Sequence, residues 1–141
     1  MYSDLSQTLT KEVDALTITW GNDEIPKHWY TEQYEEKGVY CRVSEELVAP
    51  VAQSLGSAPP VSLTGFIQFM VMVPRTDRMI RERLALVAKQ IFEQYPIESK
   101  KDGKIKLSYN GGVENAGITS SGGYSALTMR VNFSADYCGD Q

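Results

Sequence analysis

The stretch LTGFIQFMVMV, residues 63–73, decides the fold of this 141-residue chain. Every odd position in it is apolar, and several of the even positions are apolar as well. A strand that is apolar on both faces is typical of the centre of a sheet, where other elements cover it on both sides. Pro74 ends the pattern, because proline has no backbone N–H to give to a sheet ladder. We therefore expect a central strand over residues 63–73.

The segment after this strand has the clearest helical periodicity in the sequence. Thr76 or Asp77 can accept a backbone N–H bond at its start, and Pro96 stops it. Between them, apolar residues recur at spacings of three and four, as one buried face of a helix requires. This stripe consists of Ile80, Leu84, Val87, Ala88, Ile91, Phe92 and Tyr95. We expect a long helix over about residues 78–95.

Other segments have weaker but regular patterns. Near the N-terminus an amphipathic helix is predicted, with Ser3 or Asp4 as its cap. Its apolar stripe is Leu5, Leu9, Val13 and Leu16. Period-two alternation predicts strands over residues 38–44, 104–109 and 124–133. The prediction is one α+β domain over residues 1–141: a mixed, largely antiparallel β-sheet with an N-terminal helix and one long central helix packed on it.

Between these elements the sequence predicts irregular connections. Pro50 and the GSAPP stretch at residues 56–60 break regular structure. Residues 25–34 are rich in aromatic side chains without a clean period, and we expect an extended segment whose rings pack on the domain. Residues 100–103 predict a turn. The glycine-rich residues 110–123 predict a long, mobile connection.

No group of residues in the sequence indicates catalysis or metal binding. The single histidine, His28, lies among aromatic residues, which is typical of a packing or surface position. Cys41 and Cys138 have no CxxC pattern, and we interpret Cys41 as a buried strand residue and Cys138 as a free thiol. The glycines match no phosphate-binding motif. We expect a protein that is not an enzyme and that has no catalytic, metal or cofactor-binding residues.

Membrane insertion and secretion are not expected either. The longest strongly apolar run, residues 63–73, is far shorter than the roughly 20 residues that span a bilayer. Residues 1–16 lack the basic and apolar regions of a signal peptide. We therefore expect no membrane partner and synthesis in a cytoplasm-like compartment.

Charge is unevenly distributed along the chain. Residues 1–50 hold ten acids and four bases, a net charge of −6, whereas residues 51–141 hold ten bases and eight acids, a net charge of +2. The bases include a cluster at the start of the predicted long helix: Arg75, Arg78, Arg81 and Arg83. A solvated face explains such a cluster in the simplest way. The sharper hypothesis is a subunit interface in which these arginines contact an acidic surface, including the N-terminal half of a second copy. No aromatic platform or binding motif accompanies the arginines, so nucleic acid is not the expected partner.

The residues that decide the fold also carry a family resemblance. The segment Gly65–Pro74, followed by a helix containing Ala88, Ile91 and Phe92, resembles the tail terminator-like proteins of tailed bacteriophages. The resemblance extends in order and spacing over about residues 16–134. One departure is the segment Arg75–Arg78, where the family often has glycines after the proline.

The resemblance implies an α+β subunit of a homo-oligomeric ring, usually a hexamer, that closes the tail tube and joins it to the neck. The implied partners are further copies of the chain, the tail tube protein and a neck or connector protein, and the implied location is the tail or neck of the virion. A closed ring needs a contact between two different faces of neighbouring copies, which the uneven charge suits. Residues 110–123 would then be a loop that orders on docking. The alternative is a cytoplasmic protein-binding module or tail-assembly factor that forms no ring.

Overall fold

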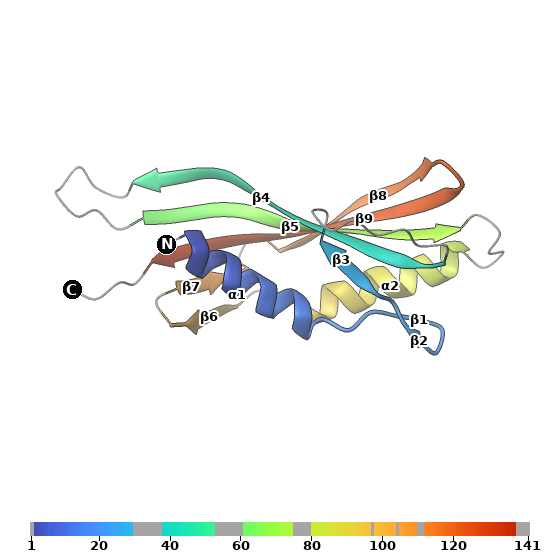
Figure 1. Ribbon diagram of the computed structural model, residues 1–141, viewed down its shortest axis with the longest axis horizontal. Coiled ribbons are helices and arrows are strands. Elements are labelled where there is room, and N and C mark those ends of the chain that lie inside the picture. The colour runs from blue at the N-terminus through green and yellow to red at the C-terminus, as the bar shows by residue number, and fades with distance from the viewer. Residues whose placement is uncertain are drawn as a thin grey trace.

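The computed structural model describes residues 2–29, 38–52, 61–74, 80–96, 98–103, 105–109 and 112–137. Within these residues the chain forms two helices and a long, mostly antiparallel sheet, which confirms the predicted α+β class (Figure 1). In chain order the elements are α1 Tyr2–Ala15, β1 Thr19–Trp20, β2 Asp23–Glu24, β3 Lys27–Trp29, β4 Tyr40–Ala52, β5 Val61–Pro74, α2 Ile80–Gln94, β6 Ser99–Asp102, β7 Ile105–Ser108, β8 Val113–Ser121 and β9 Tyr124–Tyr137. No helix among the described residues is long and apolar enough to cross a membrane.

The predicted central strand is at the centre of the sheet. Strand β5 lies between β4 and β9 and pairs antiparallel with both along its length. The strand order is β3-β4-β5-β9-β7-β6, and β8 also pairs with β9. Strands β7 and β8 share one side of β9, because β7 pairs with its C-terminal part and β8 with its N-terminal part. The short strand β3 is parallel to β4, which makes the sheet mixed, as expected.

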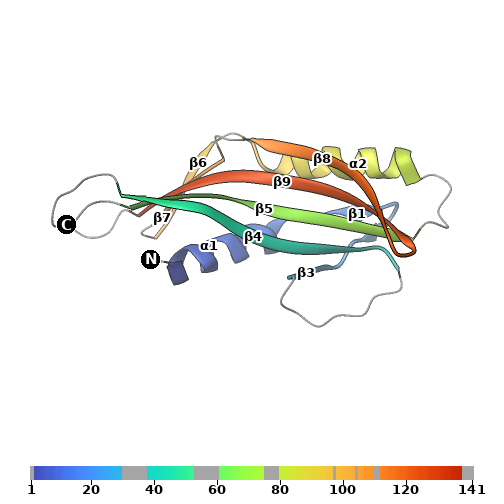
Figure 2. The same ribbon diagram turned by 90° about the horizontal axis from the view of Figure 1, so that it is seen from above.

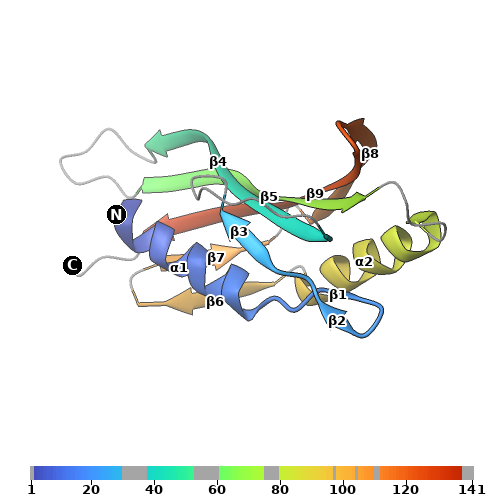
Figure 3. The same cartoon turned by 45° about the vertical axis from the view of Figure 1, so that its right-hand side comes forward.

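Both helices lie on the same face of the sheet, where the core forms (Figures 1 and 3). The odd-numbered residues of β5 and β9 point into this core, among them Ile67, Phe69 and Val131. The predicted stripe of α1 is buried in full: Leu5, Leu9, Val13 and Leu16. Full burial of one such side chain stabilises the fold by about 1.5–3 kcal/mol. The apolar alternation along the sequence therefore identifies the covered face of the sheet.

The stripe predicted for α2 is correct except at one residue. Leu84, Val87, Ile91 and Tyr95 are buried, but Phe92 is 62% exposed. A step of one residue turns a helix by about 100°, so Phe92 lies on the flank of a helix whose buried face runs through Ile91. The expected start near residue 78 lies outside the described residues, as does the cap at Thr76 or Asp77.

Two expected connections are corrected by the structure, and a third lies outside the described residues. Strand β4 continues through Pro50 to Ala52, because no described strand lies on its other side there and a proline is tolerated on an edge strand. Residues 100–102 belong to β6, and the turn begins at Gly103, whose φ is 59°. The expected stretch at residues 56–60 lies outside the described residues.

The largest correction concerns residues 110–123. Most of this glycine-rich segment is the strand β8, paired with β9 and joined to it by a turn at Gly122, whose φ is 59°. A β-bulge lies between Asn115 and Gly117, and Gly117 donates its N–H to the side chain of Asn115 at 2.8 Å. The segment is therefore an ordered edge strand, and the idea of a loop that orders on docking is wrong for the described part.

The N-terminal region is also more regular than expected. Helix α1 begins at Tyr2, so Ser3 and Asp4 lie within its first turn instead of capping it from outside. Part of the aromatic segment is strand β3, and the N–H of Cys41 donates to the carbonyl of Pro26 at 2.8 Å beside it. Trp29 packs against the core, as expected, whereas residues 30–34 lie outside the described residues.

Candidate interaction surfaces

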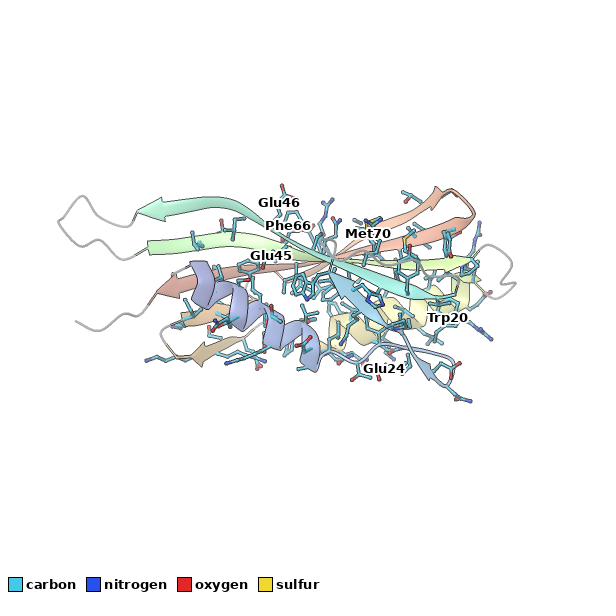
Figure 4. The ribbon with its side chains drawn as sticks, in the orientation of Figure 1. Trp20, Glu24, Glu45, Glu46, Phe66 and Met70 are labelled. Carbon is cyan, nitrogen blue, oxygen red and sulfur yellow. The ribbon has the colours of Figure 1, made fainter. Side chains whose placement is uncertain are left out.

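The side of the sheet away from α1 and α2 is covered by no described helix (Figure 2). Alternation places the even-numbered residues of three neighbouring strands on this side, in rows that follow the strand pairing. We call these residues the outer face: Tyr40, Arg42, Ser44, Glu46, Phe66, Gln68, Met70, Met72, Ala126, Thr128, Arg130 and Asn132. Figure 4 shows Glu46, Phe66 and Met70 on this side of the sheet, away from the helices.

Aromatic and arginine side chains pack together on the outer face. The guanidinium of Arg130 lies 5.2 Å from the ring centroid of Phe66, and its Nε donates to Gln68 Oε1 at 3.1 Å. The rings of Tyr40 and Tyr124 meet edge to face with centroids 5.9 Å apart. Tyrosine, phenylalanine, methionine and arginine are the residue types enriched in the cores of protein interfaces. The outer face therefore contains several residue types that are common in interface cores, although Met72 and Ala126 on it are buried within the subunit.

A second exposed feature is the β1–β2 hairpin, which α2 holds in place. Gln90 Oε1 accepts the N–H of Thr19 at 2.8 Å, and its Nε2 donates to the carbonyl of the same residue at 3.1 Å. Gln94 makes the same two bonds to Thr17, at 3.1 and 2.7 Å. The two amides thus act as a substitute for a neighbouring strand. The sequence analysis missed this role, since nothing local marks a glutamine on a helix as the partner of a strand 71 residues away.

The predicted arginine cluster is placed only in part. Arg75 and Arg78 lie outside the described residues, whereas Arg81 and Arg83 are exposed on the first turn of α2. The guanidinium of Arg83 lies 5.6 Å from the ring centroid of Trp20. A groove of about 270 Å³ opens beside this pair, and Leu86, 60% exposed, lines it. The structure therefore brings one of the arginines next to Trp20 of the same copy. An interface role for the cluster stays a prediction.

A second network is organised around Glu12, near the C-terminal end of α1 and next to the C-terminal end of α2. Glu12 Oε1 accepts the hydroxyl of Tyr109 at 2.5 Å and lies 3.0 Å from Lys100 Nζ. The backbone carbonyl of Glu12 accepts the hydroxyl of Tyr95 at 3.3 Å. Lys27 Nζ donates to the carbonyls of Val13 and Leu16, which satisfies carbonyls at the end of α1 and places a positive charge at the negative end of the helix dipole.

Burial and the Glu12 carboxylate keep the two tyrosines of this network protonated. Burial raises the pKa of Tyr109 far above its usual range, and the hydrogen bond to Glu12 and its negative charge raise it further. The pKa of Tyr95 is raised by burial first and by the charges of Glu12 and Cys41 second. Neither phenol is thus poised to act as an acid or base near neutral pH.

Next to this network a groove of about 200 Å³ opens between α1, β6 and β7. We call it the lysine groove, because three of its six lining residues are lysines: Thr8, Lys11, Glu12, Lys100, Lys101 and Leu107.

The residues weighed for chemistry occupy structural positions. Cys41 is fully buried in β4, as expected, and burial raises the pKa of its thiol to about 12, so the nucleophilic thiolate is not formed at neutral pH. His28 is half-buried on β3, opposite Arg42 of β4. The part of the chain that the structure describes holds no group of three His, Cys, Asp or Glu residues that could bind a metal ion. Cys138 lies outside it.

Comparison with known proteins gives a likeness in fold alone. No protein-family model and no curated protein matches the sequence. One solved structure, whose name carries no functional description, superposes with a TM-score of 0.63 over 82% of this chain and 82% of its own, at 16% sequence identity. At this identity the similarity concerns the fold. The α+β arrangement of one long sheet with helices on a single face is thus shared with a protein of known structure.

Proposed function

We propose that this protein is a structural virion subunit, a tail terminator or head–tail joining protein that forms a homo-oligomeric ring, hexameric by resemblance, at the end of a phage tail tube. Its partners are then neighbouring copies, the tail tube protein and a neck protein, and its location is the tail or neck of the virion. The proposal assigns it no catalytic activity. The observation that carries the proposal is the outer face.

The outer face supports assembly through its composition and its extent. An antiparallel sheet can present one face to water, but that face is then mainly polar. Here the half-buried Phe66 and Met70 occupy the middle strand of the face, with Arg42 and Arg130 beside them. A stable protein interface takes about 800 Å² from each partner, and the outer face extends over three neighbouring strands. We assign it to the contact between copies.

The first test is the oligomeric state of the purified chain. Size-exclusion chromatography with light scattering, over a wide range of protein concentration, is expected to give one closed oligomer, and negative-stain electron microscopy is expected to show rings. A chain that stays monomeric at every concentration contradicts the proposal and favours the alternative of a binding module or assembly factor without a ring.

The second test concerns the outer face itself. We expect Met70→Glu to abolish ring formation, because assembly would bury the new charge. The isolated subunit should tolerate this glutamate, since Arg42 lies directly opposite residue 70 on the neighbouring strand. The matched control is Met70→Leu, which nearly conserves the side-chain volume and should assemble like the wild type. Rings of normal yield from a folded Met70→Glu variant would show that the outer face is not the contact.

A further inference from the structure

The exposed half of α2 carries two large apolar side chains. We call its exposed residues between the two flanks of the helix the crest of α2: Glu82, Ala85, Leu86, Lys89, Phe92 and Glu93. Leu86 is 60% exposed and Phe92 is 62% exposed. Six residues of an α-helix correspond to a rotation that leaves these two side chains about 120° apart around the axis. A helix that buries only one face is expected to be polar there, so the crest is unusual in being apolar at both margins.

A preformed groove lies beside Leu86. It opens between the crest and the β1–β2 hairpin, has a volume of about 270 Å³, and includes Trp20 and Gly21 of the hairpin in its lining. The hairpin wall is held in place, because Gln90 binds both backbone groups of Thr19. The volume is several times the roughly 30 Å³ that a water molecule takes up, so the groove has room for a large side chain.

The crest and the outer face lie on opposite sides of the subunit. The subunit has two layers, the sheet and the helices, and both helices lie on one face of the sheet (Figures 1 and 3). Figure 4 shows Phe66 and Met70 on the side of the sheet away from the helices, whereas Trp20, which lines the groove, lies on the helical side. The layer stack therefore ends in the outer face on one side and includes the crest on the other.

We propose that the outer face of one copy packs on the crest of α2 of the next copy, with Phe66 and Met70 against Leu86 and Phe92. The inference rests on the proposed function, which assigns the outer face to the contact between copies and leaves open which surface it meets. Outer face and crest are different surfaces, so this contact is heterologous and repeats from copy to copy, as a closed ring requires. Two outer faces in contact would form an isologous pair, which is complete as a dimer.

The chemistry of the two surfaces favours this pairing. Phe66 and Met70 are half-buried on the middle strand of the outer face, and an added helix would cover them as α2 covers the other side of the sheet. Methionine is flexible and packs well against aromatic rings, so Met70 suits the groove between Leu86 and Trp20. In the assembled ring each α2 would then lie between its own sheet and the sheet of a neighbour.

Charge does not select the partner in this contact. Both surfaces have charges of both signs, which are Arg42, Glu46 and Arg130 on the outer face and Arg81, Glu82, Arg83, Lys89 and Glu93 on α2. Several are engaged within the copy: Arg130 lies over Phe66, Arg83 over Trp20, and Lys89 Nζ 3.8 Å from Glu93. The apolar side chains therefore provide the affinity, and the charges around them fix the relative position of the two surfaces.

The test uses two variants of the full chain that each lose one of the two surfaces. Met70→Glu places a charge on the outer face and leaves the crest intact, whereas Leu86→Glu does the reverse. Each alone should stay monomeric at concentrations at least about tenfold above those at which the wild type forms rings, because assembly would bury an unpaired carboxylate. Mixed, they should form a 1:1 pair that grows no further, because only one crest and one outer face are intact. Light scattering gives the mass, and an affinity tag on one variant gives the stoichiometry.

Two controls separate the position of the new charge from its presence. Leu86→Met nearly conserves the side-chain volume, and Gln7→Glu adds the same charge at an exposed position of α1. Both should form rings like the wild type. Thermal unfolding checks that each variant is folded, which we expect for Leu86→Glu because its side chain is largely exposed. Should it not fold, Phe92→Glu replaces it.

The outcomes separate this inference from the proposed function. Wild-type rings together with normal rings from Leu86→Glu and Phe92→Glu overturn the contact with the crest and leave the ring standing. A Leu86→Glu chain that pairs with itself shows that one outer face meets another, and a mixture that stays monomeric shows that the crest does not bind the outer face; either result overturns the inference. A wild-type chain that never forms rings overturns both the inference and the proposed function.

Discussion

Replacing Gly65 by alanine tests the packing of the two longest neighbouring strands at one point. Strand β4 has a register shift between Leu47 and Ala49, so one extra residue bulges out opposite β5. At this place the backbone of β4 comes so close to Gly65 that a Cβ there would overlap the carbonyl oxygen of Glu46 and lie 3.1 Å from the Cα of Leu47. Both obstacles are backbone atoms, which cannot rotate away as a side chain can.

The size of the expected destabilisation follows from the separation of β4 and β5 that the new methyl group requires. To admit the methyl group, β4 and β5 must separate locally, which weakens one or two ladder hydrogen bonds worth about 0.5–1.5 kcal/mol each. This agrees with the roughly 1–3 kcal/mol usual for overpacking a core. We expect Gly65→Ala to lower the free energy of unfolding by about 1–3 kcal/mol, measured by urea denaturation with an unchanged m-value.

Gly38→Ala is the matched control. A Cβ at Gly38 would meet no atom within 4 Å, and its φ is outside the left-handed region. We expect this change to be neutral or stabilising by up to about 1 kcal/mol, since alanine reduces the entropy of the unfolded chain. If Gly65→Ala were as stable as Gly38→Ala, the close approach of β4 to β5 at the bulge would be refuted.

Three further outcomes follow from the buried network and from the hairpin. Gln90→Ala should lower the free energy of unfolding by about 1–3 kcal/mol, because the two hydrogen bonds from the Gln90 side chain to the backbone of Thr19 are lost. It should also speed amide exchange at Thr19 in NMR or mass spectrometry. Because the pKa of Tyr109 is raised in the native protein, the unfolded chain loses the phenol proton at a lower pH than the native protein does. The stability that this group contributes is therefore complete below about pH 10 and is lost as the pH rises further. Tyr109→Phe should flatten this decline of the free energy of unfolding at alkaline pH. In a Cys138→Ser background, the buried Cys41 should react with a thiol reagent only on unfolding, and rapid reaction of the native protein would contradict its burial.

Several parts of the fold were predictable because their signal is local. The alternation over residues 63–73 and the apolar stripe from Leu5 to Leu16 predict directly which side chains are buried. Cys41 was likewise predicted to be buried from the alternation of its own strand. Such periodicity is a property of a single segment and needs no knowledge of its partner.

The misjudged segments are those in which a partner far away in the sequence decides the structure. Glycines between residues 110 and 123 favour a loop locally, yet pairing with β9 makes most of this segment a strand. Pro50 breaks a helix or an inner strand, but β4 has no described neighbour on that side. Phe92 fitted a helical stripe, and only the direction from which the sheet approaches α2 places it on the exposed flank.

The candidate surfaces show the same division. The sequence by itself determined a core strand, two amphipathic helices and an uneven distribution of charge. These are properties of single segments, because composition and periodicity depend only on residues that are close together in the sequence. Tertiary structure alone decided that both helices cover one face of the sheet and that Phe66 and Met70 are left on the other. The physical reason is that a surface is made of residues distant in sequence, and their relative placement is fixed by strand pairing and by the direction of helix packing.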